Sequence, residues 1–283
     1  MGYRIWLLFL SRSVIHLAGL TIAQPNFLYN FCINGNGNYT SNSAYRSNLN
    51  TALSSITSNT NRTTYGFYST SVGQNTDTAH ALALCRGDVD PETCGQCVYN
   101  STLKLRQICP NQKEAIGWYD SCMLRYSNRS ILQNMEDSPA FFMWNRNNVS
   151  SVARFNENLR TLIDSLRSRA VDGGPLRKFA TGNVPGPDFL TIYGLVQCTP
   201  DLSEDACNNC LVGAARDIPG CCDGKRGGRV IRPSCSLRFE VDPFFNESTA
   251  DATPPAPAPP LPPLSPPPPG IITLFWALVS ILN

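Results

Sequence analysis

The stretch that decides the fold occurs twice in this chain. Residues 85–122 read CRGDVDPETCGQCVYNSTLKLRQICPNQKEAIGWYDSC, and residues 198–235 read CTPDLSEDACNNCLVGAARDIPGCCDGKRGGRVIRPSC. Both copies share the spacing Cys-x8-Cys-x2-Cys-x11-Cys-x12-Cys. Because an internal repeat marks a unit that folds once per copy, the sequence predicts two tandem domains, at residues 24–135 and 136–248.

The residues around each cysteine framework predict the same order of elements. Apolar residues recur on one helical face over residues 45–56 and 155–166, so each copy should carry an amphipathic helix there. Acidic and hydroxyl residues at 91–93 and 203–205 suit the start of a second helix. Strands are expected at residues 65–72, 79–86, 115–127 and 228–241. The predicted class is α+β, with an antiparallel sheet and two helices on one side of it in each domain.

Both ends of the chain are predicted to lie outside the two domains. A basic start, an apolar middle and the small residues Thr21 and Ala23 make residues 1–23 a secretory signal peptide, and a retained membrane anchor is the alternative. Residues 249–269 form a proline-rich stalk of extended polyproline character. Residues 270–283 form a short hydrophobic tail, in which a glycolipid-anchor signal is the alternative to a plain secreted end.

The cysteine count sets the expected covalent chemistry. Twelve cysteines behind a signal peptide indicate disulfides, although each Cys-x-x-Cys pair is also a spacing that binds zinc. We therefore expect no metal and no cofactor. Six N-glycosylation sequons fit an extracellular chain, at Asn38, Asn61, Asn100, Asn128, Asn148 and Asn246.

Composition argues against several functions. A net charge of +2 with 16% charged residues disfavours nucleic-acid binding through a general basic field. Only two histidines occur, and His16 lies in the expected signal peptide, which disfavours histidine-based catalysis. No kinase motif is present, and no spacing brings together the carboxylate pair that a glycosidase needs. Binding fits this composition better than catalysis, and we expect no enzyme activity.

The tandem framework resembles a plant family. Together with YGLVQCTPDLS, Cys-Cys-x-Gly-x-x-Gly-Gly-Arg and Pro-Ser-Cys-x-x-Arg-Phe-Glu, it is similar to the ginkbilobin-homologous domains of cysteine-rich repeat secretory proteins and of cysteine-rich receptor-like kinase ectodomains. The resemblance covers residues 24–248. It implies a disulfide-stapled, five-stranded antiparallel sheet with two helices in each domain.

The resemblance also implies how the cysteines pair. In the second copy, Trp144 stands at the position of Cys32, and Cys221 has appeared beside Cys222. An adjacent bridge would restore an even count there, and two free thiols are the alternative. The expected pairs are Cys32–Cys109, Cys85–Cys94, Cys97–Cys122, Cys198–Cys207, Cys210–Cys235 and Cys221–Cys222.

A sugar site is implied for the second copy only. The antifungal member of the family binds mannose, and the three residues of its site match Asn145, Arg229 and Glu240 here. An amide, a guanidinium and a carboxylate supply the donors and acceptors that sugar hydroxyls require. The alternative is structural: Arg229 pairs with Glu240, and Asn145 caps a strand end. The first copy carries Ile33, Ile116 and Ser127 at these positions, so it should not bind sugar in this way.

The resemblance implies a secreted, apoplastic binding protein in defence or signalling. Its partners would be cell-wall or fungal glycans, or a plasma-membrane receptor. Since the stalk stands where receptors of the family continue into a membrane span, the alternative is a kinase-less ectodomain that acts as a decoy or co-receptor. An enzyme acting on glycans is the remaining alternative.

The tail is predicted not to span a membrane. The thirteen residues after Gly270 rise only about 20 Å as a helix, against roughly 30 Å of hydrocarbon, and no basic flank follows. Alkaline carbonate should therefore release the protein from membranes, unless phospholipase treatment shows that a glycolipid holds it. Protein that resists both treatments would contradict this expectation.

Overall fold

The computed structural model describes residues 25–60, 66–173 and 177–246. The predicted signal peptide, stalk and tail, together with the sequon at Asn61, lie outside these stretches. None of the helices in the described stretches has the length and hydropathy that crossing a bilayer requires.

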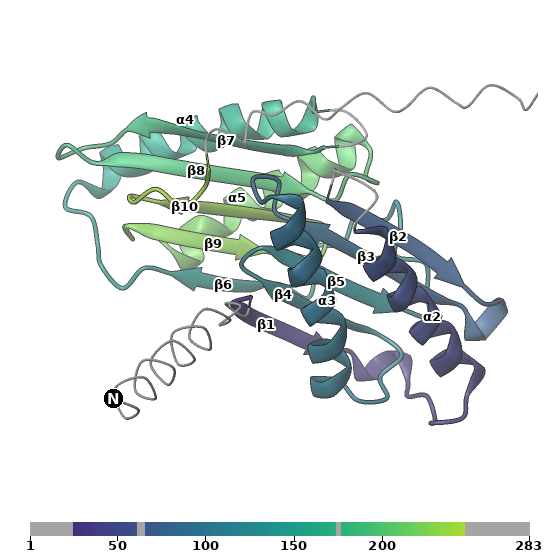
Figure 1. Ribbon diagram of the computed structural model, residues 1–283. Coiled ribbons are helices and arrows are strands. Elements are labelled where there is room, and N and C mark those ends of the chain that lie inside the picture. Colours follow the sequence, from purple (N-terminus) through teal and green to yellow (C-terminus); the bar gives the residue numbers. More distant parts are fainter. Residues whose placement is uncertain (1–24, 61–65, 174–176, 247–283) are drawn as a thin grey trace, which may run out of the picture.

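The first repeat folds into one five-stranded antiparallel sheet with two α-helices (Figure 1). The strands lie in the order β1-β4-β5-β3-β2, so the hairpin at the end of the repeat occupies the middle of the sheet. The elements are β1 (Phe27–Cys32), η1 (Asn34–Asn36), α2 (Ala44–Asn59), β2 (Phe67–Val72), η2 (Asn75–Asp77), β3 (Ala79–Cys85), α3 (Pro91–Ile108), β4 (Ala115–Tyr119) and β5 (Cys122–Ser127).

The second repeat has the same topology, with the strand order β6-β9-β10-β8-β7. The predicted fold class, two tandem α+β domains, is confirmed. The strands predicted at residues 115–127 and 228–241 are each a hairpin of two strands, with turns at residues 120–121 and 232–234 respectively. The elements are β6 (Phe141–Trp144), α4 (Val152–Val171), β7 (Phe179–Pro185), β8 (Thr191–Cys198), α5 (Glu204–Cys221), β9 (Gly227–Ile231) and β10 (Cys235–Glu240).

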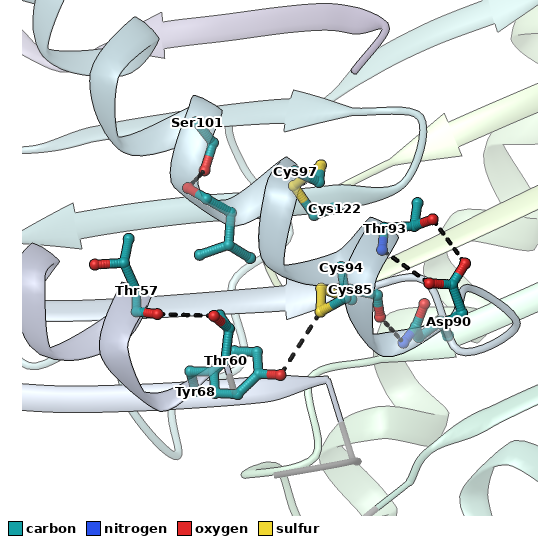
Figure 2. Close-up of a disulfide and its surroundings, with 12 residues drawn as sticks. Thr57, Thr60, Tyr68, Cys85, Asp90, Thr93, Cys94, Cys97, Ser101 and Cys122 are labelled. Carbon is teal, nitrogen blue, oxygen red and sulfur yellow. Dashed lines mark hydrogen bonds between the residues drawn. A yellow bond between two sulfur atoms is a disulfide. The ribbon is translucent and has the colours of Figure 1, made fainter. Parts of the chain in front are cut away.

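The helices follow from periodicity and caps. The Asp90 carboxylate accepts hydrogen bonds from the backbone N–H and the hydroxyl of Thr93, at 2.9 and 2.7 Å, and so caps α3 (Figure 2). Ser203 caps α5 by accepting from Ala206 N–H at 3.1 Å. The apolar faces predicted for the first helix of each copy are the buried faces of α2 and α4: Tyr45, Leu49, Ala52, Leu53 and Ile56, and Phe155, Leu159, Leu162, Ile163 and Leu166.

Five of the six disulfides join a helix or its C-terminal end to a strand, and the sixth joins the neighbours Cys221 and Cys222 at the end of α5. Every cysteine of the chain lies in the described stretches and is paired. Figure 2 shows Cys85–Cys94 and Cys97–Cys122 at the start of α3, with the Tyr68 hydroxyl 3.7 Å from the Cys94 sulfur. The pairs are those that the resemblance implies: Cys32–Cys109, Cys85–Cys94, Cys97–Cys122, Cys198–Cys207, Cys210–Cys235 and Cys221–Cys222.

The two domains pack through the sheet faces that the helices leave free. In Figure 1, α2 and α3 lie in front of the first sheet, and α4 and α5 lie behind the second. Trp118 of β4 packs on Phe141 of β6 with ring centroids 5.2 Å apart, and Gln197 Nε2 donates to the Cys85 carbonyl at 2.9 Å. The apolar cluster between the sheets is Leu82, Leu84, Ile116, Trp118, Met123, Ile131 and Ile231, with Phe141 packed against it.

The two domains should differ in how much their third disulfide stabilises them. Cys32–Cys109 closes a sequence separation of 77 residues, whereas Cys221–Cys222 closes a separation of 1. Because a cross-link stabilises mainly by restricting the unfolded chain, replacing the first pair with alanine should lower the free energy of unfolding by about 4 kcal/mol, and replacing the second by about 1 kcal/mol. Denaturant titration of the two double variants measures both values. Equal losses would contradict this account.

Candidate functional site

Two of the predicted sugar-site residues, Asn145 and Glu240, lie on either side of Gly227 in the second sheet. Asn145 follows β6, and its N–H donates to the Gly227 carbonyl of β9 at 2.9 Å. Glu240 lies directly opposite Gly227 on β10. A Cβ at position 227 would lie 1.8 Å from the Glu240 Oε2 atom, so any side chain there would displace the carboxylate. Glycine at position 227 therefore leaves the space that the Glu240 carboxylate occupies.

Arg229 lies in the next row of the same face. It is opposite Met143 on β6 and opposite Arg238 on β10. The structure brings Asn145, Arg229 and Glu240 together around one small pocket of about 150 Å³, which Met143, Trp144 and Gly228 complete. The guanidinium side chain is 17% exposed and the carboxylate side chain 20%, so both are partly desolvated but can be reached from solvent.

The structural alternative, an ion pair between Arg229 and Glu240, is wrong, because each of these residues has a different partner. Arg229 Nη1 lies 2.6 Å from an oxygen of Asp120, in the β4–β5 turn of the first domain, and no ion pair joins it to Glu240 among the described residues. Arg238 Nε instead donates to Glu240 Oε1 at 3.2 Å. Asn145 does end its strand: its side-chain oxygen accepts from the Asn147 N–H at 2.9 Å.

Asp120 connects the site to the first domain. Its carboxylate also lies 3.0 Å from Arg86 Nη1 and 3.5 Å from Arg238 Nη1. Burial alone would raise the pKa of Asp120, but the charges of Arg229, Arg86 and Arg238 outweigh it and lower that pKa below its usual value. One carboxylate of the first domain thus holds Arg229 directly and Glu240 through Arg238.

The pKa of Arg238 reflects its buried position beside Arg229. Burial, with the facing charge of Arg229, lowers the pKa of Arg238 to about 10, although Asp120 and Glu240 act in the opposite direction. The guanidinium also lies over the Phe244 ring, 4.0 Å from its centroid. Arg238 keeps its charge at neutral pH because its partners offset the burial.

The first domain fills the equivalent space with its own ion cluster. Ile116 is fully buried between the sheets, and Ser127 donates to Glu114 Oε2 at 3.0 Å. Glu114 stands at the repeat position of Gly227 and is fully buried, with Arg125 Nη2 and Arg129 Nη2 2.8 and 2.7 Å from its Oε1 atom. Ile33, Ile116 and Ser127 therefore surround a closed cluster, not a polar pocket.

Sequence reasoning missed Gly227, Arg238 and Asp120. The repeat carries a signal for Arg238, because Arg125 occupies the same position in the first copy. Asp120 has no such signal, because its role arises only when the domains dock.

The predicted glycosylation sites differ in exposure. Asn38, Asn148 and Asn246 are exposed, whereas Asn100 and Asn128 are half-buried. Glycosylation at these positions stays a prediction.

Comparison with known proteins settles the family. The profile of the salt stress response/antifungal family matches this chain twice, over residues 31–129 and 143–242. The chain belongs to this family. Both matches coincide with the two sheets, so each repeat is one family domain.

The relatives include both secreted and receptor-like proteins. An antimicrobial ginkbilobin-2-like protein of Castanea crenata is 40% identical over 230 residues, 81% of this chain and 92% of the relative. Cysteine-rich receptor-like protein kinase 25 of Arabidopsis thaliana is 43% identical over 239 residues, 83% of this chain and 35% of the relative. This chain thus spans about a third of the receptor-like kinases that it matches, and most of the Castanea crenata protein.

A solved structure shows the same fold. The tandem DUF26 ectodomain of the Arabidopsis thaliana cysteine-rich receptor-like protein PDLP8 aligns with a TM-score of 0.67 and 24% identity. The alignment covers 77% of this chain and 98% of the ectodomain.

Removal of the Asp120 charge should destabilise the protein in a pH-dependent way. Asp120→Asn leaves three guanidinium groups without their shared carboxylate and should lower the free energy of unfolding by roughly 1–3 kcal/mol at pH 7. Because folding lowers the pKa of Asp120, its contribution is present above the ordinary carboxyl value of about 3.9 and disappears as the pH falls through the folded-state pKa. Denaturant titrations of the variant and wild type should therefore converge in acid.

The matched control is Asp137→Asn, which changes an exposed aspartate of the segment between the domains. This control should leave the free energy of unfolding unchanged both at pH 7 and in acid. A loss for Asp120→Asn that stays constant from pH 7 into acid would contradict the electrostatic role of this residue.

Proposed function

We propose that this protein is a secreted, non-enzymatic binding module of the plant apoplast, whose second domain binds a mannose-type sugar. One observation carries the proposal: Asn145, which lies far from the other two in the sequence, lines one pocket on the second sheet together with Arg229 and Glu240. The names of the relatives support an extracellular role, since they include an antimicrobial protein and a cysteine-rich repeat secretory protein.

The three side chains have complementary chemistry for vicinal hydroxyl groups. The amide of Asn145 both donates and accepts, and the Glu240 carboxylate accepts from two hydroxyls. Asp120 engages the Nη1 atom of Arg229, which leaves the other N–H groups of this guanidinium to donate to a ligand. At about 150 Å³ the pocket is smaller than the roughly 300–1,000 Å³ of sites for drug-sized ligands, so it suits a single terminal sugar ring.

The charge arrangement favours binding over glycan hydrolysis. Hydrolysis by the usual mechanism needs two carboxyl groups, one of which gives or takes the proton. Among the residues that the structure describes, Glu240 is the one carboxylate that lines this pocket. The neighbouring Asp120 is held ionised by three guanidinium groups and does not supply an acid.

The kinase-less ectodomain remains the second candidate function. The match to the receptor-like kinases, at 43% identity for cysteine-rich receptor-like protein kinase 25, favours it. In that role the protein would act as a decoy or co-receptor at the plasma membrane, with or without a glycolipid anchor, and the same pocket would serve as its ligand site.

Loss of one charged side chain should weaken sugar binding. A hydrogen bond to a charged group is worth roughly 1.5–3 kcal/mol, so Arg229→Ala and Glu240→Gln should each reduce the affinity for mannose-type glycans about tenfold or more. Titration of these glycans into the glycosylated protein from secretory cells measures the effect, after a glycan array has identified a bound sugar.

Two further variants separate binding from folding. Arg229→Lys keeps the charge beside Asp120 but loses the planar fork, and it should weaken sugar binding while preserving more of the thermal stability than Arg229→Ala does. Arg146→Gln changes an exposed arginine beside Asn145 and should bind sugar like wild type. Equal affinity across all variants would place the sugar site elsewhere.

A further inference from the structure

A groove lies between α4 and α5, on the side of the second domain opposite the candidate sugar pocket. The groove has a volume of about 420 Å³, within the range of small-molecule sites. Its floor is apolar and is made of Leu159, Ile163, Val212, Ala215 and Ile218. It is separate from the sugar pocket, because the helices cover the face of the sheet that points away from the first domain.

The first domain closes the corresponding groove with a hydrogen bond. Arg106 Nη1 of α3 donates to Asn50 Oδ1 of α2 at 2.9 Å and so bridges the two helices. In the second repeat, the positions of Asn50 and Arg106 are taken by Arg160 and Pro219. Proline has no side-chain donor, so this bridge cannot form between α4 and α5.

The second domain has also gained positive charge around the groove. Arg160, Arg167 and Arg216 line it, where the first repeat has Asn50, Thr57 and Leu103. Arg167 donates a hydrogen bond to the side-chain oxygen of Asn208 and lies 3.3 Å from Asp164. The Asp223 carboxylate accepts a hydrogen bond from Asn156 at 2.7 Å.

Two of these arginines, Arg160 and Arg216, have no polar partner among the described residues. Over the described part of the chain, neither Arg160 nor Arg216 has a hydrogen-bond or ion-pair partner, and both are exposed. They come from opposite helices, so each wall of the groove contributes one free guanidinium. Pro219 also changes the α5 wall of the groove. Because proline has no N–H, it donates no hydrogen bond to the Ala215 carbonyl one turn earlier in the helix.

We infer that this groove binds a small amphipathic organic acid, whose apolar chain or ring lies on the floor and whose carboxylate binds Arg160 and Arg216. Guanidinium groups bind carboxylates in fixed, often bidentate geometry, and an apolar body would cover Val212, Ala215 and Ile218, which are partly exposed. Asp164 and Asp223 at the rim disfavour a polyanion. The proposal does not depend on sugar binding by the pocket on the other face.

The test uses octanoate as the probe, with octan-1-ol and octylammonium as matched ligands of the same chain length. Calorimetric titration into the full glycosylated protein should show binding of octanoate, about tenfold or more weaker binding of octan-1-ol, and no binding of octylammonium. Arg160→Gln and Arg216→Gln should each weaken octanoate binding about tenfold. Arg154→Gln, an exposed arginine on α4 outside the groove, should bind like wild type.

A double variant tests the groove without loss of the fold. Arg160→Asn combined with Pro219→Arg rebuilds the residue pair that bridges α2 and α3, and it removes a proline from a helix interior. Octanoate binding should be lost while the thermal midpoint stays equal or rises. No octanoate binding by wild type at millimolar concentration, equal binding of octan-1-ol, or octanoate binding by the double variant would each overturn the proposal.

Discussion

The helix-free faces of the two sheets must be covered, and each covers the other. A sheet with helices on one side only leaves an apolar face exposed, and here Trp118, Ile231 and Phe141 show that both sheets use theirs as the domain interface. Asp120 lies at the edge of this apolar contact, between one arginine of its own domain and two of the other. Because these charges are partly buried, loss of one leaves its partners unpaired, so the ion cluster favours the alignment in which all of them meet.

This alignment also shapes the candidate sugar pocket. Arg229 and Arg238 lie directly opposite each other on neighbouring strands, where two like charges would repel. The carboxylates of Asp120 and Glu240 neutralise them and hold both side chains in position. The pocket therefore belongs to the second domain by its lining but depends on the first domain for its geometry.

The repeat supplies an internal comparison in which the fold is constant and the chemistry differs. At one equivalent position, Glu114 closes the first domain with a buried ion cluster, whereas Gly227 makes room for the Glu240 carboxylate in the second. At the first helix pair, an Arg106–Asn50 hydrogen bond bridges the helices, whereas Pro219 leaves the groove of the second domain open. Substitutions at a few equivalent positions of a shared scaffold thus distinguish the first domain from the second, which carries both candidate ligand sites.

The sequence alone determined the elements, their order and the repeat. The apolar face of α4 and the cap of α5 are local patterns, because a helix brings together residues that lie three or four positions apart. The resemblance carried the cysteine pairing and placed Asn145, Arg229 and Glu240 at family positions. What these residues touch was decided only by the tertiary structure. Asp120 and Arg229 are 109 residues apart and meet because two sheets dock, a contact for which no periodicity along the chain exists.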